Sequence, residues 1–296
     1  MKIVVTGGRG FIGSHFVEEA LNKEHEIIDI DKMGYASNKN LPWDKHPNYS
    51  FIKADISEIT HLPNCELLIN FAAESHVDNS INDTMPFIKS NIDGVHNLLE
   101  LVRGKASYER PLFFHISTDE VYGDILQGEF KESDILNPSN PYSATKAAAE
   151  MLVLAYSRTY GINYVITRSS NNYGPRQFEE KLIPKCISRI KRNKKIPLHG
   201  DGTYVRDWLY VKDNVDGIFK IIESENINEI YNISSQNYMQ NIEVAKTILS
   251  WFDSNEEMIK FVENRWGQDL RYAVDNQKLR SLGWSPKKNK GLYKWF

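Results

Sequence analysis

The first thirteen residues contain a glycine-rich turn that constrains the fold of the whole chain. An apolar run, 3–5, leads into Gly7, Gly10 and Gly13, and a helical pattern begins at Phe11. Glycines at this spacing permit a tight turn, close approach of the backbone to a pyrophosphate, and close packing of helix on strand. The free N–H groups at the helix start then bind the anion. The pattern predicts a strand–turn–helix unit that binds a dinucleotide.

The end of the next strand predicts which dinucleotide is bound. It carries Asp29 and Asp31, and a carboxylate there accepts hydrogen bonds from a ribose diol and repels an added 2′-phosphate. We favour Asp31, the last strand residue, for this contact. Lys32 and Arg9 add positive charge without reversing the preference, so we expect NAD as the cofactor.

Short β-branched runs alternate with helical patterns through the first half, as in βαβ units of a parallel sheet. After the third strand, Asp55 and Ile56 either meet the adenine edge or, for Asp55, cap a helix. Strands are expected at Lys2–Thr6, Glu26–Asp31, Tyr49–Lys53, Leu67–Phe71, Leu112–Ser117 and Tyr164–Arg168, and helices at Phe11–Leu21, Thr84–Arg103 and Pro141–Tyr160.

The pattern changes after about residue 168, which suggests two lobes. We expect an α/β fold: a Rossmann-type doubly wound parallel sheet in residues 1–170, and a smaller C-terminal substrate-binding lobe in 171–296. The segment Ile196–Val211 reads as a hairpin or paired strands, and Asn241–Phe252 as a helix. A later strand, near 230–234, can return to the main sheet.

Composition excludes several classes of protein. A net charge of −3 gives no reason to expect nucleic acid or a membrane surface as a partner. The two cysteines have no metal-ligand spacing, and we expect no metal. The sequence shows no signal peptide and no apolar stretch near the ~20 residues of a membrane span. We therefore expect a cytoplasmic protein.

Two pairs of ionisable residues predict proton-transfer chemistry. Asp119 and Glu120 follow an apolar strand, and a proton shared between close carboxylates separates their pKa values. Tyr142 and Lys146 lie four residues apart, which places them on one helical face. A nearby ammonium lowers the pKa of a phenol towards that of a useful base. The chain thus has the groups for proton removal at two substrate positions.

Together these motifs resemble the extended short-chain dehydrogenase/reductase superfamily, and within it the dTDP-glucose 4,6-dehydratase family. The resemblance covers nearly the whole chain. An acid at the position of Asp119 is specific to this dehydratase family, because the related epimerases and decarboxylases lack one. The stretches that carry it are 31–36, 71–78, 117–123, 141–146, 171–175, 180–184, 199–202 and 206–208.

The resemblance implies a role for each catalytic residue. Tyr142 takes the proton from the sugar 4-hydroxyl, Lys146 holds the nicotinamide ribose, and Thr118 hydrogen-bonds the reacting hydroxyl. Glu120 then removes the carbon-5 proton while Asp119 protonates the departing 6-hydroxyl. The implied reaction converts dTDP-glucose to dTDP-4-keto-6-deoxyglucose, with NAD regenerated in place.

The resemblance also implies two sets of binding residues. The cofactor set is Gly7, Gly10, Phe11, Ile12, Gly13, Asp31, Lys32, Asp55, Ile56, Ala72, Ala73, Ser75, Tyr142 and Lys146. The set for the nucleotide-diphosphate sugar is Asn171, Asn172, Lys181, Leu182, Arg206, Asn241 and Arg265.

Several alternatives remain open from sequence. Glu179, Trp266 and Gln268 depart from the family pattern beside the expected nucleotide pocket, so the same chemistry on UDP-glucose or another UDP-sugar stays an alternative. An epimerase or decarboxylase, and a non-catalytic dinucleotide-binding protein, are further alternatives. We also expect a homodimer, because apolar residues at 148–156 form a stripe on a helix that often pairs with its copy in this superfamily; the stripe can instead face its own core.

Overall fold

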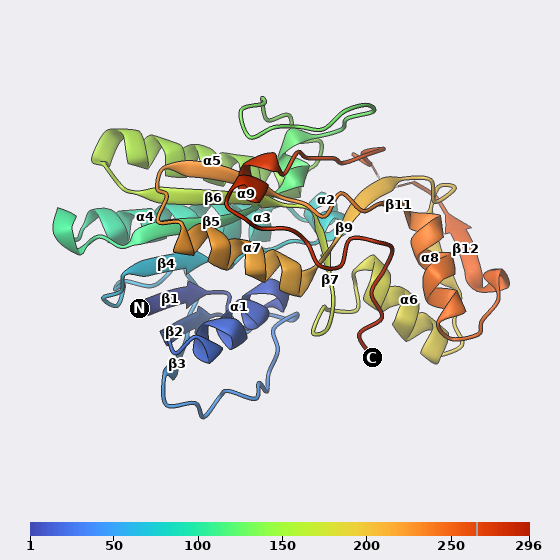
Figure 1. Ribbon diagram of the computed structural model, residues 1–296, viewed down its shortest axis with the longest axis horizontal. Helices are drawn as coiled ribbons and strands as arrows, with labels where there is room; N and C mark the ends of the chain where they lie inside the picture. Colours follow the sequence, from blue (N-terminus) through green and yellow to red (C-terminus); the bar gives the residue numbers. More distant parts are fainter. Residues whose placement is uncertain (265) are drawn as a thin grey trace.

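A computed structural model describes residues 1–264 and 266–296 (Figure 1). The strands are β1 (Lys2–Thr6), β2 (Glu26–Asp31), β3 (Tyr49–Lys53), β4 (Leu67–Asn70), β5 (Leu112–Thr118), β6 (Tyr164–Ser169), β7 (Asn171–Tyr173), β8 (Ile196–His199), β9 (Val205–Tyr210), β10 (Glu229–Ile233), β11 (Tyr238–Gln240) and β12 (Ile259–Val262). The α-helices are α1 (Phe11–Asn22), α2 (Val77–Asn82), α3 (Met85–Phe87), α4 (Gly94–Arg103), α5 (Pro141–Tyr160), α6 (Leu182–Lys191), α7 (Val211–Glu223), α8 (Asn241–Ser250) and α9 (Gln277–Ser281).

The main sheet is parallel throughout its described strands, in the order β10-β6-β5-β4-β1-β2-β3. The strand order reverses between β1 and β4, and ligands of such sheets bind at the carboxyl ends of strands beside this reversal. The late strand β10 pairs with β6, so a segment of the second half does return to the sheet. The expected α/β, Rossmann-type sheet is confirmed.

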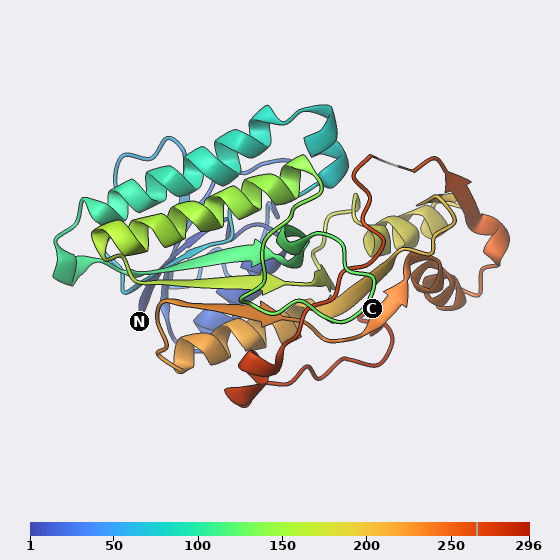
Figure 2. The same ribbon diagram turned by 90° about the horizontal axis from the view of Figure 1, so that it is seen from above.

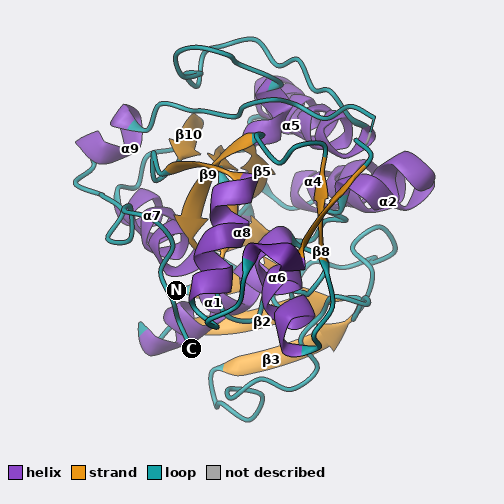
Figure 3. Ribbon diagram, turned by 90° about the vertical axis from the view of Figure 1, so that its right-hand side faces the viewer, coloured by secondary structure: helices purple, strands orange, loops and turns teal. Residues whose placement is uncertain are grey.

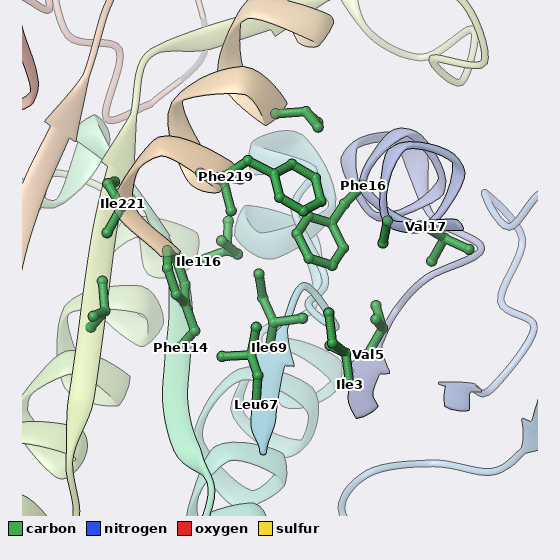
Figure 4. Close-up of a cluster of buried hydrophobic side chains, with 14 of the residues drawn as sticks. Ile3, Val5, Phe16, Val17, Leu67, Ile69, Phe114, Ile116, Phe219 and Ile221 are labelled. Carbon is green, nitrogen blue, oxygen red and sulfur yellow. The ribbon is translucent and has the colours of Figure 1, made fainter. Parts of the chain in front are cut away.

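Helices cover both faces of the sheet, as expected for strands that are apolar on both sides. Helices α4 and α5 lie side by side over one face, and α1 and α7 over the other (Figures 1 and 2). On the second face, the buried rings of Phe16 and Phe219 stack with centroids 4.8 Å apart, above Ile69 and Val5 (Figure 4). These two apolar layers fix the strand ends that carry the site.

A smaller lobe stands beyond the carboxyl ends of the main strands. Helices α6 and α8 pack against each other there, over a core that includes Ile183, Cys186 and Val244 (Figure 3). The short strands join it in a three-stranded sheet, β11-β9-β7, and a pair, β12-β8.

Two expected elements differ in the structure. The segment Ile196–Val211 is not a hairpin, because β8 pairs with β12 and β9 pairs with β7 and β11. The segment Thr84–Arg103 is not one α-helix: a π-helical stretch, Ile88–Asp93, separates α3 from α4. Wider π-helical turns re-aim side chains and are frequent at functional sites. Here the stretch contains Ser90 and Asn91, which bond to groups around the site described below.

Candidate active site at the carboxyl edge of the sheet

The glycine turn after β1 leaves no room for side chains. Gly7 has φ +71°, and a Cβ there would lie 2.6 Å from the main-chain nitrogen of Ala72. A Cβ at Gly13 would lie 2.3 Å from the carbonyl oxygen of Gly7. The turn therefore packs directly on the segment that follows β4. Its backbone forms one wall of a cavity, and a pyrophosphate in this cavity can approach the backbone closely.

This cavity has a volume of about 250 Å³ and lies at the reversal of strand order. It collects residues that are far apart in sequence, from the glycine turn to α5. The sequence-predicted cofactor residues that line it are Gly7, Gly10, Phe11, Ile12, Gly13, Asp31, Lys32, Asp55, Ile56, Ala72, Ala73, Ser75, Tyr142 and Lys146. Residues that our cofactor prediction did not include also line it, among them Tyr35, Glu74, Ser90, Gln177, Phe178 and Glu180.

The two aspartates of β2 occupy different positions. Asp31 lines the cavity, and its carboxylate accepts hydrogen bonds from the main-chain nitrogens of Met33 (2.7 Å) and Arg9 (3.1 Å). Asp29 lies under the turn, where it accepts from Gly8 N (2.9 Å) and Tyr49 Oη (2.8 Å). Burial raises the pKa of Asp29 to about 7. Of the two carboxylates, the cavity exposes Asp31 to a ligand.

Asp55 caps a turn and also lines the cavity, so its contact with an adenine stays a prediction. Its Oδ1 accepts from the main-chain nitrogen (3.0 Å) and hydroxyl (2.8 Å) of Ser57, so it caps the following turn. It also lines the cavity beside Ile56. These hydrogen bonds lower the pKa of Asp55 despite its partial burial, so Asp55 presents a carboxylate to the cavity.

The acid pair lies just past the end of β5. Asp119 is 2% exposed, and burial followed by the nearby charges of Glu120 and Asp207 raises its pKa well above the usual value. Its Oδ1 accepts from the Thr118 hydroxyl at 3.3 Å, whereas its Oδ2 has no hydrogen-bond partner in the described part of the chain. A protonated carboxyl is the form that such burial favours. Asp119 is thus placed to hold a proton that it can donate.

The N-terminus of α5 fixes the second pair. Asn140 and Ser143 form a reciprocal capping box, and Pro141 occupies the first turn. Tyr142 is buried, and its phenol lies close to Thr118. The Thr118 hydroxyl donates to the Asp119 carboxyl, so these three side chains lie together at the end of β5.

The expected lowering of the tyrosine pKa is wrong for this structure. Burial, and then the charge of Glu120, raise the pKa of Tyr142 above its usual value. The Lys146 ammonium instead donates to the carbonyl oxygen of Ile116 at 2.7 Å, and burial lowers its own pKa to about 8. The packing of α5 on β5 directs the lysine to the strand, which spacing along a helix does not predict.

A buried ion pair between Glu150 and Arg168 contacts the end of β5. Glu150, one helical turn after Lys146, receives hydrogen bonds from Arg168 Nε (3.0 Å) and Nη2 (2.6 Å). It also accepts from the Ser117 hydroxyl at 2.5 Å, next to Thr118 in sequence. Both side chains are almost fully buried. Our sequence reasoning missed this role, although Glu150 is an unusual charge on the inward face of a predicted helix.

Of the predicted substrate residues, the structure brings Lys181 to the cavity. Its Nζ donates to the carbonyl oxygen of Ser75 at 2.6 Å. Asn171 and Asn172 begin β7, and the Oδ1 of each is buried without a partner among the described residues. Leu182 is the first residue of α6.

Arg206 and Asn241, which we also predicted to bind the substrate, lie outside the cavity lining. Arg206 is buried under the 269–272 segment, where it donates to the Asp269 carbonyl oxygen (2.9 Å) and lies 4.2 Å from the Tyr272 ring centre. Asn241 is the first residue of α8. Arg265 lies outside the described residues. The structure thus places Arg206 and Asn241 in the smaller lobe, outside the lining of the cofactor cavity.

Tyr272 is a neighbour of the acid pair that our sequence reasoning missed. Its hydroxyl lies 3.5 Å from Glu120 Oε2 and donates to Asp269 Oδ2 at 2.5 Å. Asp269 also accepts from Ser139 at 2.6 Å. The available sequence signal was the position of Asp269 directly after Gln268, in a segment that we expected beside the nucleotide pocket.

Glu179, which we expected beside the nucleotide pocket, is absent from the cavity lining although Phe178 and Glu180 on either side belong to it. Its carboxylate accepts hydrogen bonds from Ser188 (2.9 Å) on α6 and from Arg192 (3.0 Å), directly after that helix. Trp266 is 86% exposed. Residues 1–264 and 266–296 contain no cluster of His, Cys, Asp and Glu that could hold a metal, and none of their helices is long and apolar enough to cross a membrane.

A Rossmann-type sheet with a glycine turn, an acidic residue at the end of β2 and a Tyr-x-x-x-Lys pair at the cofactor cavity defines an extended short-chain dehydrogenase/reductase. The chain matches the GDP-mannose 4,6 dehydratase family over residues 4–290 and belongs to that family. The resemblance inferred from its motifs is confirmed.

Individual proteins refine this assignment. The chain is 44% identical to the low-salt glycan biosynthesis protein Agl12 of Haloferax volcanii, over 97% of this chain and 94% of that protein. It is 44% identical to an Arabidopsis thaliana trifunctional UDP-glucose 4,6-dehydratase/epimerase/reductase, over 96% of this chain but only 44% of that longer protein. Its fold is similar to that of Streptomyces venezuelae DesIV, a dTDP-glucose 4,6-dehydratase crystallised with NAD and TYD, at a TM-score of 0.93 and 38% identity over 97% and 92% of the two chains.

Proposed function

We propose that the protein is an NAD-dependent nucleotide-sugar 4,6-dehydratase, a hydro-lyase that converts dTDP-glucose to dTDP-4-keto-6-deoxyglucose. Asp119 carries this proposal. A carboxyl that burial keeps protonated, directly beside a second carboxyl, supplies an acid and a base at one position. Elimination of water needs both, whereas an epimerase or a decarboxylase does not need this acid.

The residues around the cavity divide the remaining work. Tyr142 removes the proton from the 4-hydroxyl, and Thr118, which lies close to the phenol, orients that hydroxyl. Glu120 removes the carbon-5 proton as Asp119 protonates the departing 6-hydroxyl. Lys146 holds the nicotinamide ribose. Because burial and then the neighbouring Glu120 charge raise the Tyr142 pKa, we propose that the phenol becomes a base only once substrate and cofactor have changed these surroundings.

The cavity fits NAD. The turn without Cβ atoms leaves room for a pyrophosphate, and Asp31, Asp55 and Ile56 line the cavity, which supports their proposed contacts with the ribose and the adenine. NAD, when bound, takes a hydride from carbon 4 and returns it to carbon 6. Because no net oxidation occurs, we expect the protein to purify with its dinucleotide bound and to turn over without added cofactor.

For the sugar nucleotide we propose the remaining predicted residues, Asn171, Asn172, Lys181, Leu182, Arg206, Asn241 and Arg265. The unpartnered oxygens of Asn171 and Asn172 support this, since buried polar atoms normally have a partner. UDP-glucose is a second candidate substrate, because the UDP-glucose-using relative is as similar to the chain as any reported above. Mass spectrometry of products from dTDP- and UDP-sugars distinguishes the two.

Deuterium labelling tests the reaction itself. With substrate deuterated at carbon 4, the label should appear in the methyl group of a 4-keto product. Release of the label into free NADH, or a requirement for stoichiometric NAD, would show a conventional dehydrogenase instead.

We also propose that the protein is a cytoplasmic homodimer that pairs through α5. Met151 on α5 is 49% exposed, and Ala155, one turn further along, is also exposed. Exposed apolar residues on one helical face support an interface. Light scattering at micromolar concentration should give twice the 34.2 kDa chain mass, and a monomer mass would refute the dimer.

A further inference from the structure

Arg9 occupies the one position in the glycine turn where a cation could change cofactor choice. Its main-chain nitrogen donates to Asp31 Oδ2 at 3.1 Å, so the residue adjoins the carboxylate proposed to meet the adenosine ribose. An arginine beside such a ribose accommodates the 2′-phosphate of NADP, because its planar fork makes paired bonds to phosphate oxygens. The direction of this side chain therefore bears on the choice between NAD and NADP.

The Arg9 side chain points away from the cavity. Its Nη2 donates to Asp44 Oδ1 at 2.6 Å, and its Nη1 lies 3.3 Å from the Asn38 carbonyl oxygen. The guanidinium carbon stands 4.3 Å from the Phe51 ring centre. The side chain is 6% exposed, and Arg9 is absent from the cavity lining although Gly7 and Gly10 on either side belong to it. The guanidinium is thus enclosed by the 38–51 segment.

Asp44 supplies the charge in this enclosure. It is the partner in the only ion pair that Arg9 makes within the described chain, and a buried charge needs a paired counter-ion. The other contacts of the Arg9 side chain are with carbonyl oxygens and aromatic rings, which are uncharged. Asp44 is itself placed by its second oxygen, which accepts from Leu41 N at 3.1 Å.

The second cation near Asp31 is also paired. Lys32 lines the cavity, but its Nζ donates to Glu74 (2.7 Å) and to Ser90 (3.0 Å). Its side chain is 39% exposed, so this pair is screened more than that of Arg9. Asp31 receives neutral donors, from Arg9 N, Met33 N and the Ser37 hydroxyl. Within residues 1–264 and 266–296, no cationic side chain forms an ion pair with the Asp31 carboxylate that lines the cavity.

We propose that Asp44 is a specificity-determining residue of the cofactor site: by holding Arg9 in the 38–51 wall, it keeps the guanidinium from a 2′-phosphate and makes the cavity select NAD. This inference rests on the dinucleotide site of the proposed function. Selectivity for NAD over NADP then has two parts. Asp31 repels a 2′-phosphate inside the cavity, and Asp44 holds the Arg9 guanidinium outside it.

Fluorescence titration of the protein with NADH and with NADPH tests this. The Asp44→Asn variant keeps the shape of the side chain and an acceptor for Leu41 N but removes the charge. We expect it to raise the affinity for NADPH relative to NADH about tenfold, because the released guanidinium can then form charge-assisted hydrogen bonds with the 2′-phosphate. The gain should shrink at high salt. In the double variant Arg9→Gln/Asp44→Asn it should disappear.

Controls separate the possible results. Glu58→Gln removes a carboxylate from an exposed pair with Lys89, outside the cavity lining, and should leave the ratio unchanged. If Asp44→Asn leaves the ratio of NADPH to NADH affinity unchanged, or if the double variant keeps the gain in NADPH affinity, the role of Asp44 is overturned while the proposed cofactor site stands. A protein that binds neither dinucleotide overturns the proposed cofactor site, and this inference falls with it.

Discussion

The ammonium of Lys146 donates a 2.7 Å hydrogen bond to the carbonyl oxygen of Ile116, on the strand that ends in the acid pair. The lysine is buried on α5, and its pKa falls from 10.5 to about 8 because burial disfavours the charged form. Near neutral pH the buried Lys146 ammonium therefore lowers the stability of the folded state. It lies at a position where the proposed reaction needs a positive charge.

Replacing Lys146 should increase stability while it removes activity. The unfolded chain binds more protons than the folded one between pH 8 and 10.5, so the cost is fully present below pH 8 and fades as the pH rises through that window. Lys146→Met should raise the free energy of unfolding at pH 7.5 by about 1–3 kcal/mol, measured in urea. The exposed substitution Lys39→Met is the control. A less stable Lys146→Met protein at pH 7.5 would contradict the desolvation argument.

Asp119→Asn should stop the reaction between oxidation and loss of water. The amide cannot donate the proton that the departing hydroxyl needs, so turnover should fall by roughly 10²–10⁴-fold. NADH absorbance should accumulate on the enzyme in a single turnover. Glu120→Gln is the matched variant and should also stall before elimination, because the carbon-5 proton stays in place. Normal turnover in Asp119→Asn would refute its role as the acid.

Tyr35 should slow the release of the cofactor. Its hydroxyl donates to Glu180 at 3.0 Å and its ring meets Phe178 edge-on at 5.3 Å, which joins two loops that line the cavity. Losing one hydrogen bond to a charged group costs ~1.5–3 kcal/mol, so Tyr35→Phe should speed NAD release about tenfold in stopped-flow displacement. Tyr108→Phe, at a tyrosine that is 86% exposed, should have no effect. Equal release rates for all three proteins would rule the contact out.

His15 should make the protein less stable in mild acid. Its Nε2 lies 2.9 Å from the Pro175 carbonyl oxygen and its Nδ1 lies 2.6 Å from Arg176 Nη2, a pair of contacts that suits the neutral ring. Burial lowers its pKa from 6.5 to about 4. The unfolded chain therefore binds the extra proton between those values, and stability falls as the pH drops from 6.5 to 4.

The measurement is the difference between wild type and His15→Gln. The wild type should lose up to about 3 kcal/mol more unfolding free energy than the variant between pH 7 and pH 4. The comparison removes the contributions of other groups, such as Asp29, whose pKa is raised. Parallel pH profiles for the two proteins would mean that His15 is not a buried neutral histidine.

The sequence by itself determined the local elements. The bounds of β1, β2, β3 and α5 are those expected, because each carries its own signals: alternation and β-branching in the strands, Asn140, Pro141 and Gly161 around α5. The glycine turn is likewise a local steric requirement. The acid pair was recognisable because its two members are adjacent in sequence.

Only the tertiary structure decided how these elements meet. The partners of β8 and β9 and the π-helical stretch before α4 arise from packing between distant segments. The raised pKa of Tyr142 and the enclosure of Arg9 by Asp44 have the same origin. Burial and charge pairing are set by neighbours from elsewhere in the chain, and spacing along one helix or turn carries no information about them. The sequence thus names the reactive groups, and the packing sets their charge and direction.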